Sequence, residues 1–342
     1  METKERSSGI ELLRLLAMFS IVFYHSIATY LDKCPYDNMV RACVYVNHWG
    51  VPVFLLISGF FSIKLRLNRI VSFYFYCTIW MFIDLLIAYI TESSDISHQQ
   101  LFNCLLPFSH TNLWFVQYYF WLMLFSPILN LAVKNMSRRN LISIIIILLI
   151  VTLYFSLIWR SPIIVVGKSI IYVSIIYLLG GCVKRELNIF SEYYSVCKKA
   201  IIAIVLLVMF ITLFLSTRYQ FLLGKLVFYY VSPLNIFISV LLLVCFAKIP
   251  FKNILINYIA KSAFAVYLFH ECYLTKDLFY GIVDKITELS NQSSLIFISY
   301  SFLFALVTMV MAIILDIIVR KPIHTFLMKL IEKMPYSSYI IK

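Results

Sequence analysis

Charged residues are scarce in this chain. Asp, Glu, Lys and Arg together supply 13% of its 342 residues, and only 16 residues are acidic, whereas about a quarter of a soluble domain is charged. Hydrophobic residues supply 62% of the chain, and the mean hydropathy is +0.91. These values exclude soluble enzymes, nucleic-acid-binding proteins and disordered regulators. We therefore expect no nucleic-acid partner, although the formal net charge is +13.

Long polar segments, glycine-rich linkers and internal repeats are also lacking. The longest connections between apolar blocks are too short to fold alone, and they lie near residues 32–44, 92–112, 184–199 and 275–293. We therefore expect one transmembrane domain over residues 1–342, with no appended extracytoplasmic domain. No signal peptide is predicted, because the first apolar block has the length of a membrane span, contains Arg14 and lacks a clear cleavage site.

The cysteines show no metal-binding pattern. The eight residues are Cys34, Cys43, Cys77, Cys104, Cys182, Cys197, Cys245 and Cys272. Because no Cys-x-x-Cys pair occurs, we expect most of them to pack as small apolar side chains, and we predict no metal site. Cys34 and Cys43 share an external connection, and the sequence leaves open whether they form a disulfide.

The apolar residues fall in blocks of about 20, which is the length that a helix needs to cross about 30 Å of hydrocarbon. We predict an all-α integral membrane protein, a bundle of about ten transmembrane helices. The predicted spans are residues 9–31, 45–65, 70–91, 113–133, 140–159, 163–183, 200–217, 226–247, 253–274 and 294–319.

Basic residues are distributed unevenly between the connections. With the N-terminus inside, most of the 29 Lys and Arg residues fall in cytoplasmic connections, as the positive-inside rule requires. Both termini are therefore predicted to be cytoplasmic. Membrane lipids are the expected surroundings of such a multi-pass chain.

Ionisable side chains inside the spans are the first candidates for function, because each costs about 2.5–3.5 kcal/mol at mid-span. In the first span Glu11 and Arg14 lie one turn apart, and His25 lies 11 residues beyond Arg14. That spacing is almost three helical turns, so Arg14 and His25 share one face, about 16 Å apart along the axis. A stripe of polar residues is therefore predicted to lead from the cytoplasmic surface into the bundle.

Histidine exchanges a proton near neutral pH, which favours a catalytic role for His25. The alternative for His25 is a hydrogen bond that joins two helices. The alternative for Arg14 is an interfacial anchor at the lipid head groups.

Five short motifs follow one another along the chain. They are Glu11-Leu-Leu-Arg14 with His25, Val51-Pro-Val-Phe-Leu-Leu-Ile-Ser-Gly-Phe60, Leu113-Trp-Phe-Val116, Ala260-Lys-Ser-Ala-Phe-Ala-Val-Tyr-Leu-Phe-His270 and Arg320-Lys-Pro322. In order and spacing they resemble the membrane acyltransferase 3 family of bacterial O-acyltransferases, whose first span carries an arginine and a histidine at this separation. The resemblance covers essentially the whole chain.

The resemblance implies a reaction and a location. An acyl group, most often acetyl, moves from cytoplasmic acyl-coenzyme A to a hydroxyl of an extracytoplasmic or lipid-linked glycan, in the cytoplasmic membrane of a bacterium. His25 is the implied general base, with a transient acyl-histidine as the second possibility. Arg14 is expected to steady a donor phosphate or to polarise the stripe, and Glu11 to fix the Arg14 side chain.

Arg66 and Arg69 follow the second span. The family commonly has two arginines separated by three residues at this place, whereas two residues separate them here. The resemblance implies that they bind acyl-coenzyme A, because guanidinium groups form strong bidentate bonds with phosphate. A positive-inside loop is the alternative.

Asp84, Trp114, His270 and Glu271 are further candidates for binding the acceptor or supporting the site. Asp84 and His270 are predicted at a depth similar to that of His25. An orienting contact to a histidine is considered for Asp84, an ion pair or acceptor contact for His270 and Glu271, and sugar stacking for Trp114. The alternatives are a structural hydrogen bond for Asp84, a packing or interfacial role for His270 and Glu271, and the interfacial aromatic belt for Trp114.

Two other sets of polar residues have simpler explanations. Asp316 and Arg320 are one turn apart and predict an i,i+4 salt bridge. Ser58 and Gly59 predict a close-packing step between helices and not a nucleophile.

Two other functional classes stay open. A glycan-lipid transporter or flippase also uses charges inside the membrane, and inverted repeats would favour it. A polysaccharide polymerase has a similar number of spans, and a large external loop would favour that class.

Overall fold

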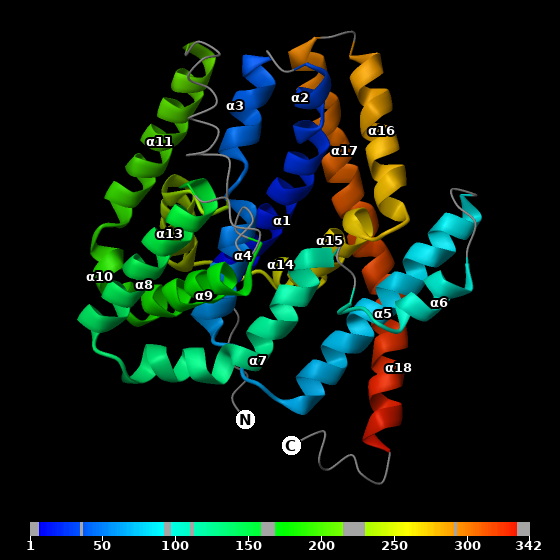
Figure 1. Ribbon diagram of the computed structural model, residues 1–342, viewed down its shortest axis with the longest axis horizontal. Helices are drawn as coiled ribbons and strands as arrows, with labels where there is room; N and C mark the ends of the chain where they lie inside the picture. Colours follow the sequence, from blue (N-terminus) through cyan, green and yellow to red (C-terminus); the bar gives the residue numbers. More distant parts are fainter. Residues whose placement is uncertain are drawn as a thin grey trace.

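The computed structural model describes residues 7–34, 37–91, 97–109, 113–158, 168–214, 230–290 and 293–333, and every regular element in these ranges is helical. In chain order the elements (Figure 1) are α1 (Ser8–Ala28), α2 (Tyr30–Lys33), α3 (Asn38–Val46), α4 (Gly50–Phe61), α5 (Leu67–Ile90), α6 (His98–Cys104), α7 (Trp114–Asn135), α8 (Arg138–Leu153), η2 (Tyr154–Ile158), α9 (Ile170–Arg185), α10 (Leu187–Glu192), α11 (Tyr194–Phe214), α13 (Pro233–Ala247), α14 (Ile254–Ile259), η4 (Ala260–Ser262), α15 (Ala263–Glu271), α16 (Thr275–Leu289), α17 (Ser294–Leu315), η5 (Asp316–Arg320) and α18 (Lys321–Glu332).

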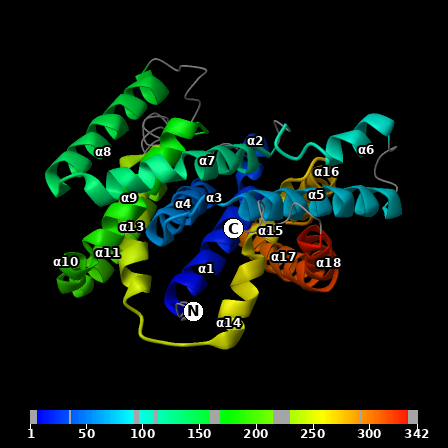
Figure 2. The same ribbon diagram turned by 90° about the horizontal axis from the view of Figure 1, so that it is seen from below.

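Helix α1 lies in the middle of the bundle. Helices α4, α13, α15 and α17 pack around it, as the view from below makes clear (Figure 2). Its apolar residues occur on all sides, and Leu13, Ala17, Val22 and Ile27 are fully buried. A helix that is apolar all round belongs in a core. The polar residues of α1 therefore lie at the centre of the protein.

Two glycines bring α4 and α9 close together. A Cβ atom at Gly59 would lie 2.0 Å from the carbonyl oxygen of Tyr177, and one at Gly180 would lie 2.2 Å from that of Leu56. No side chain fits at either position, so the two backbones are in direct contact. This geometry agrees with the close-packing step that Ser58 and Gly59 predict.

Six helical segments in the described ranges are long and apolar enough to cross a membrane. They are Ser8–Lys33, Asn38–Phe61, Leu67–Ile90, Trp114–Asn135, Arg138–Ser156 and Ser294–Glu332. Outward-facing apolar side chains, such as Ile147 on α8 and Leu303 on α17, are each 57% exposed in the isolated chain. Lipid is the surrounding in which such side chains are stable, so the chain is a multi-pass membrane protein.

The other predicted spans correspond to the shorter helices α9 and α13, to α11 (Tyr194–Phe214) and to one broken helix. Parts of spans 163–183, 200–217 and 226–247 lie outside the described residues, and span 253–274 consists of α14, η4 and α15. The count of ten spans and the cytoplasmic placement of both termini stay predictions.

The predicted connections contain helices of their own. The connection after α15 forms α16, whose Phe279 and Val283 are buried while Asp277 is exposed. This helix starts where the Asp84 carboxylate accepts hydrogen bonds from the backbone N–H groups of Leu274 and Thr275. Too short to fold alone, these segments are stabilised by packing on the bundle.

We expect Gly59→Ala to lower the melting temperature of the purified protein, because its new methyl group collides with the backbone of α9. Overpacking of this kind costs about 1–3 kcal/mol. The matched control is Gly281→Ala on α16, where a Cβ atom meets nothing within 4 Å. Alanine is the better helix former, so the control should melt at or slightly above the parental temperature. Intrinsic fluorescence during heating in detergent measures both, and identical melting of Gly59→Ala and parent would contradict the close approach.

Candidate active site

A cluster of two histidines and a glutamate lies inside the bundle, and we call it the histidine cluster. His25 comes from the last turn of α1, and His270 and Glu271 come from the last turn of α15. His25 Nδ1 lies 3.0 Å from His270 Nε2 and 3.4 Å from Glu271 Oε1. The side chain of His25 is 18% exposed, whereas His270 is fully buried. The sequence alone placed these residues at a similar depth, and the structure brings them into contact.

The backbone determines how protons are arranged in the histidine pair. His270 Nδ1 lies 2.5 Å from the carbonyl oxygen of Val266, which can only accept a hydrogen bond, so Nδ1 carries the hydrogen. In a neutral His270, Nε2 is then the acceptor, and His25 Nδ1–H donates to it. The lone pair of His25 is thereby left on Nε2. A second histidine thus holds His25 in the tautomer that a general base requires.

Glu271 is the anionic member of the cluster. Its Oε2 accepts a hydrogen bond from Lys276 Nζ at 3.0 Å, and its Oε1 accepts one from the Tyr280 hydroxyl at 3.2 Å. These bonds hold the carboxylate beside His25 Nδ1, where it stabilises positive charge on the imidazole ring. Ligand atoms of the three cluster residues also lie within 4.8 Å of one another, close enough to share a metal ion. Lys276 would compete with such a cation, and the absence of a metal stays a prediction.

A narrow cavity adjoins His25, and we call it the histidine cavity. Its volume is about 20 Å³, and it is lined by Met18, Ile21, His25, Val51, Phe54, Trp114, Phe115, Tyr230, Phe264 and Tyr267. That space holds about one water molecule. Trp114 therefore lies next to the histidine, and Lys168 Nζ lies 5.6 Å from the centre of its indole ring.

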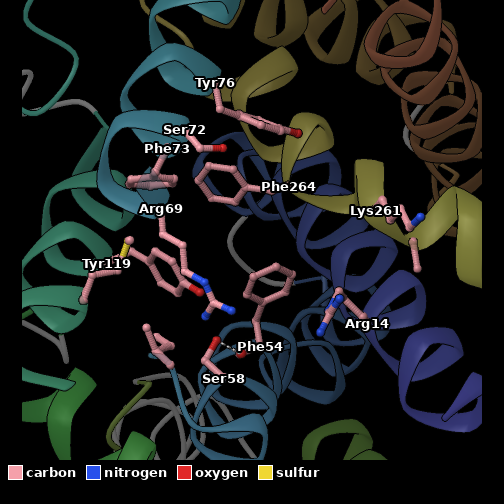
Figure 3. A pocket seen from close by; sticks show the side chains of 13 residues that line it. Arg14, Phe54, Ser58, Arg69, Ser72, Phe73, Tyr76, Tyr119, Lys261 and Phe264 are labelled. Carbon is pink, nitrogen blue, oxygen red and sulfur yellow. Dashed lines mark hydrogen bonds between the residues drawn. The ribbon is translucent and has the colours of Figure 1, made fainter. Parts of the chain in front are cut away.

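A larger cavity of about 400 Å³ opens beside the other half of α1, and we call it the cationic cavity. Arg14 of α1, Arg69 of α5 and Lys261 of η4 line it, and none of its described lining residues is acidic. In Figure 3 the Arg14 and Arg69 side chains reach in from opposite sides of the Phe54 ring. Glu11 Oε2 accepts a hydrogen bond of 2.8 Å from Arg14 Nη1 and so fixes this guanidinium group.

Phe54 and Phe264 line both cavities. Their ring centres lie 6.5 Å apart, so the two rings form an apolar constriction between the cationic cavity and the histidine cavity. Arg14 and His25 line the two cavities from the same face of α1, as their spacing predicts. The distance between them along the helix axis is about 16 Å.

Arg66 and Arg69 occupy different places although they are neighbours in sequence. Both side chains are exposed, but Arg66, at the N-cap of α5, lies outside the lining of the cationic cavity, whereas Arg69, almost one turn later, lines it. Asp84 lies further along α5, where it binds the start of α16. The structure therefore brings Arg14 and Arg69 to the cationic cavity and His25 and Trp114 to the histidine cavity, and it places Arg66 and Asp84 elsewhere.

Several site residues were not singled out from the sequence. The residues that also contact or line the site are Lys261, Lys276, Tyr230 and Tyr280. In the sequence the two lysines look like ordinary charges of the connections between spans, and the two tyrosines look like ordinary aromatic residues. The sequence contained one usable signal: Lys261 belongs to the Ala260–His270 motif, nine residues before its histidine.

The sequence left open whether Cys34 and Cys43 form a disulfide. In the structure both are free thiols.

The predicted Asp316–Arg320 salt bridge is present and supports the wall of the cationic cavity. Arg320 Nε donates to Asp316 Oδ1 at 2.7 Å, and Arg320 Nη2 donates to Oδ2 at 2.5 Å. Tyr76, which lines the cavity, donates its hydroxyl to the same carboxylate at 3.2 Å, and Trp80 Nε1 does so at 3.1 Å. The pair is a structural element beside the site.

Comparison with known proteins adds one finding. Residues 7–317, nearly the whole chain, match a family model described as an acyltransferase domain. No curated protein and no solved structure matches the chain.

We expect Asp316→Asn to destabilise the protein by about 3–5 kcal/mol, because it leaves a buried guanidinium group without its counter-charge. The side chain of Arg320 is only 7% exposed. The matched control is Asp284→Asn, which breaks the exposed pair of Asp284 and Lys33 and should change stability little. Unfolding by SDS titration measures both variants. If the two variants unfold at the same SDS fraction, the buried pair has no structural role.

Proposed function

Because this chain belongs to the acyltransferase 3 family, we propose that it transfers an acyl group, most often acetyl, from cytoplasmic acyl-coenzyme A to a hydroxyl of an extracytoplasmic or lipid-linked glycan. One observation carries the proposal. A cationic cavity and a paired histidine lie on the same face of one central helix and are separated by an apolar constriction. The expected location is the cytoplasmic membrane of a bacterium.

The cationic cavity suits the charged end of the donor. Coenzyme A carries three phosphate groups, and guanidinium groups bind phosphate by bidentate, charge-assisted hydrogen bonds. Arg14 and Arg69 supply these groups from opposite sides of the cavity, and Lys261 adds a third charge. Glu11 acts on the donor indirectly, by holding Arg14.

The apolar constriction suits the uncharged arm of the donor. About 16 Å along α1 separates Arg14 from His25, and the extended pantetheine arm of coenzyme A has a comparable length. With the phosphates in the cationic cavity, the arm passes Phe54 and Phe264 and brings the thioester to His25. The histidine cavity is too narrow for the arm as it stands, so these rings must separate when the donor binds.

The histidine cluster suits the chemical step. His25 Nε2 takes the proton from the acceptor hydroxyl while its oxygen attacks the thioester carbonyl. The carbon–sulfur bond breaks, the ester forms, and the leaving thiolate takes the proton from the imidazolium ring. His270 keeps His25 in the required tautomer, and Glu271 stabilises the transient positive charge. Atoms and charge balance without a metal ion.

We expect His25→Ala to lower the transfer rate by at least about 100-fold, the contribution of a well-placed general base. His270→Ala should have a smaller effect, because it removes only the group that orients His25. The assay follows radiolabelled acetyl-coenzyme A and lipid-linked glycans with purified protein in nanodiscs. Binding of acetyl-coenzyme A to each variant is the control for folding. Transfer at the parental rate by His25→Ala would remove the general base from the mechanism.

We expect Arg69→Ala to raise the KM for acetyl-coenzyme A about tenfold or more, since a hydrogen bond to a charged group is typically worth about 1.5–3 kcal/mol. The kcat should change less, because Arg69 does not touch the reacting atoms. Arg66→Ala is the matched comparison: Arg66 stands at the start of the same helix but does not line the cationic cavity, so we expect a smaller increase. Equal effects of the two substitutions would mean that the donor binds outside the cationic cavity.

A further inference from the structure

A third cavity, of about 310 Å³, lies between α5, α6 and the connection from α15 to α16, and we call it the polar cleft. It is lined by Met81, Asp84, Leu85, Ser97, Gln99, Gln100, Asn103, Cys104, Tyr273 and Leu274. Neither the donor site nor the catalytic step described above uses it.

The lining of the polar cleft combines neutral hydrogen-bonding groups with one acid and one aromatic ring. Gln99, Gln100 and Asn103 supply carboxamides, which both donate and accept, as sugar hydroxyls do. Tyr273 is 52% exposed, so its ring offers an apolar face to the C–H groups of a sugar. No Lys or Arg occurs among the described lining residues, which disfavours a phosphate or sulfate ligand.

Asp84 is held in place in the wall of the cleft. Its side chain is buried, and it accepts hydrogen bonds from the backbone N–H groups of Thr275 at 2.8 Å and Leu274 at 3.2 Å. A carboxylate oxygen has more than one acceptor site, so Asp84 can also accept from a ligand hydroxyl. Gln100 is held too, because its Oε1 accepts from the Ser97 backbone N–H at 2.7 Å. Its amide nitrogen is then the group that it offers to a ligand.

The polar cleft lies far from the donor site but close to the histidine cluster. Asp84 follows Arg69 by 15 residues on α5, which corresponds to about 22 Å along the helix axis. Leu274 follows Glu271 by three residues, so their Cα atoms are at most about 11 Å apart. The wall of the cleft is therefore directly continuous in the chain with the end of α15 that carries His270 and Glu271, whereas the cationic cavity lies at the other end of α5.

We propose that the polar cleft binds neutral sugar units of the glycan acceptor next to the unit that is acylated. This proposal rests on the proposed function. It adds a binding site whose ligand is an uncharged oligosaccharide, held by Gln99, Gln100, Asn103 and Asp84 and stacked on Tyr273.

The test is saturation-transfer difference NMR on the full chain in nanodiscs, with maltotetraose, mannotetraose and chitotetraose as probes and no donor present. We expect saturation transfer to at least one probe, and about tenfold weaker binding to Gln99→Ala/Asn103→Ala, which removes two neutral hydrogen-bonding groups. Tyr273→Ala should weaken the binding of the same probe. His98→Ala is the matched control, since His98 lies on α6 outside the cleft lining and should leave binding unchanged.

The outcomes separate this proposal from the proposed function. Absence of saturation transfer to all three probes overturns the assignment of the cleft, whatever the acyltransferase assay shows. Equal sugar binding by the double variant and the parent overturns it too. If sugars bind as expected but no acyl group is transferred, the catalytic proposal fails while the sugar site stands. Acetyl-coenzyme A should bind the parent and the double variant equally. If the double variant loses this binding, its fold is disturbed and Tyr273→Ala decides: parental sugar binding by that variant overturns the assignment of the cleft.

Discussion

The contact between His25 on α1 and His270 on α15 places ionisable groups where the surroundings are apolar. Such groups are stable inside a bundle only when each has a partner. The described structure supplies the partners in pairs: Lys276 beside Glu271, Glu11 beside Arg14, and Arg320 beside Asp316. Two of these pairs lie within one helix, so they form as soon as the helix does. The histidine pair needs the packing of α15 against α1, which makes that interface the element on which the site depends.

Phe54 and Phe264 divide the charged part of the site from the chemical part. A thioester beside a general base is open to attack by water as well as by an alcohol, and a dry constriction limits the supply of water. The histidine cavity holds about one water molecule, so little solvent is present beside His25 before the donor arrives. In the proposed mechanism the donor arm itself separates the two rings, which couples donor binding to access.

The features that follow from local periodicity could be predicted from the sequence. The long apolar helices and the common face of Arg14 and His25 depend only on block length and helical spacing, and the family match confirms the resemblance carried by the five motifs. The break of span 253–274 at Lys261 was missed, because α14 and α15 read as one apolar block. The contact of His25 with His270, across 245 positions, depends on tertiary packing. Which of Arg66 and Arg69 faces the cavity depends on where α5 begins, and composition does not determine that residue.

The two ends of α5 differ in chemistry, and that difference gives the proposed reaction a direction. Arg69 at one end faces a cavity whose described lining contains three cations and no acid, whereas Asp84 near the other end belongs to a cleft with one acid and no cation. A polyanionic donor is attracted to the cationic cavity, whereas the polar cleft has no cation to neutralise its charge. A neutral glycan has hydrogen-bonding partners in the polar cleft, whereas in the cationic cavity it must displace the solvation of three charges. In the proposed reaction, the donor therefore approaches the histidine cluster from the end of α5 that carries Arg69, and the glycan approaches it from the end that carries Asp84.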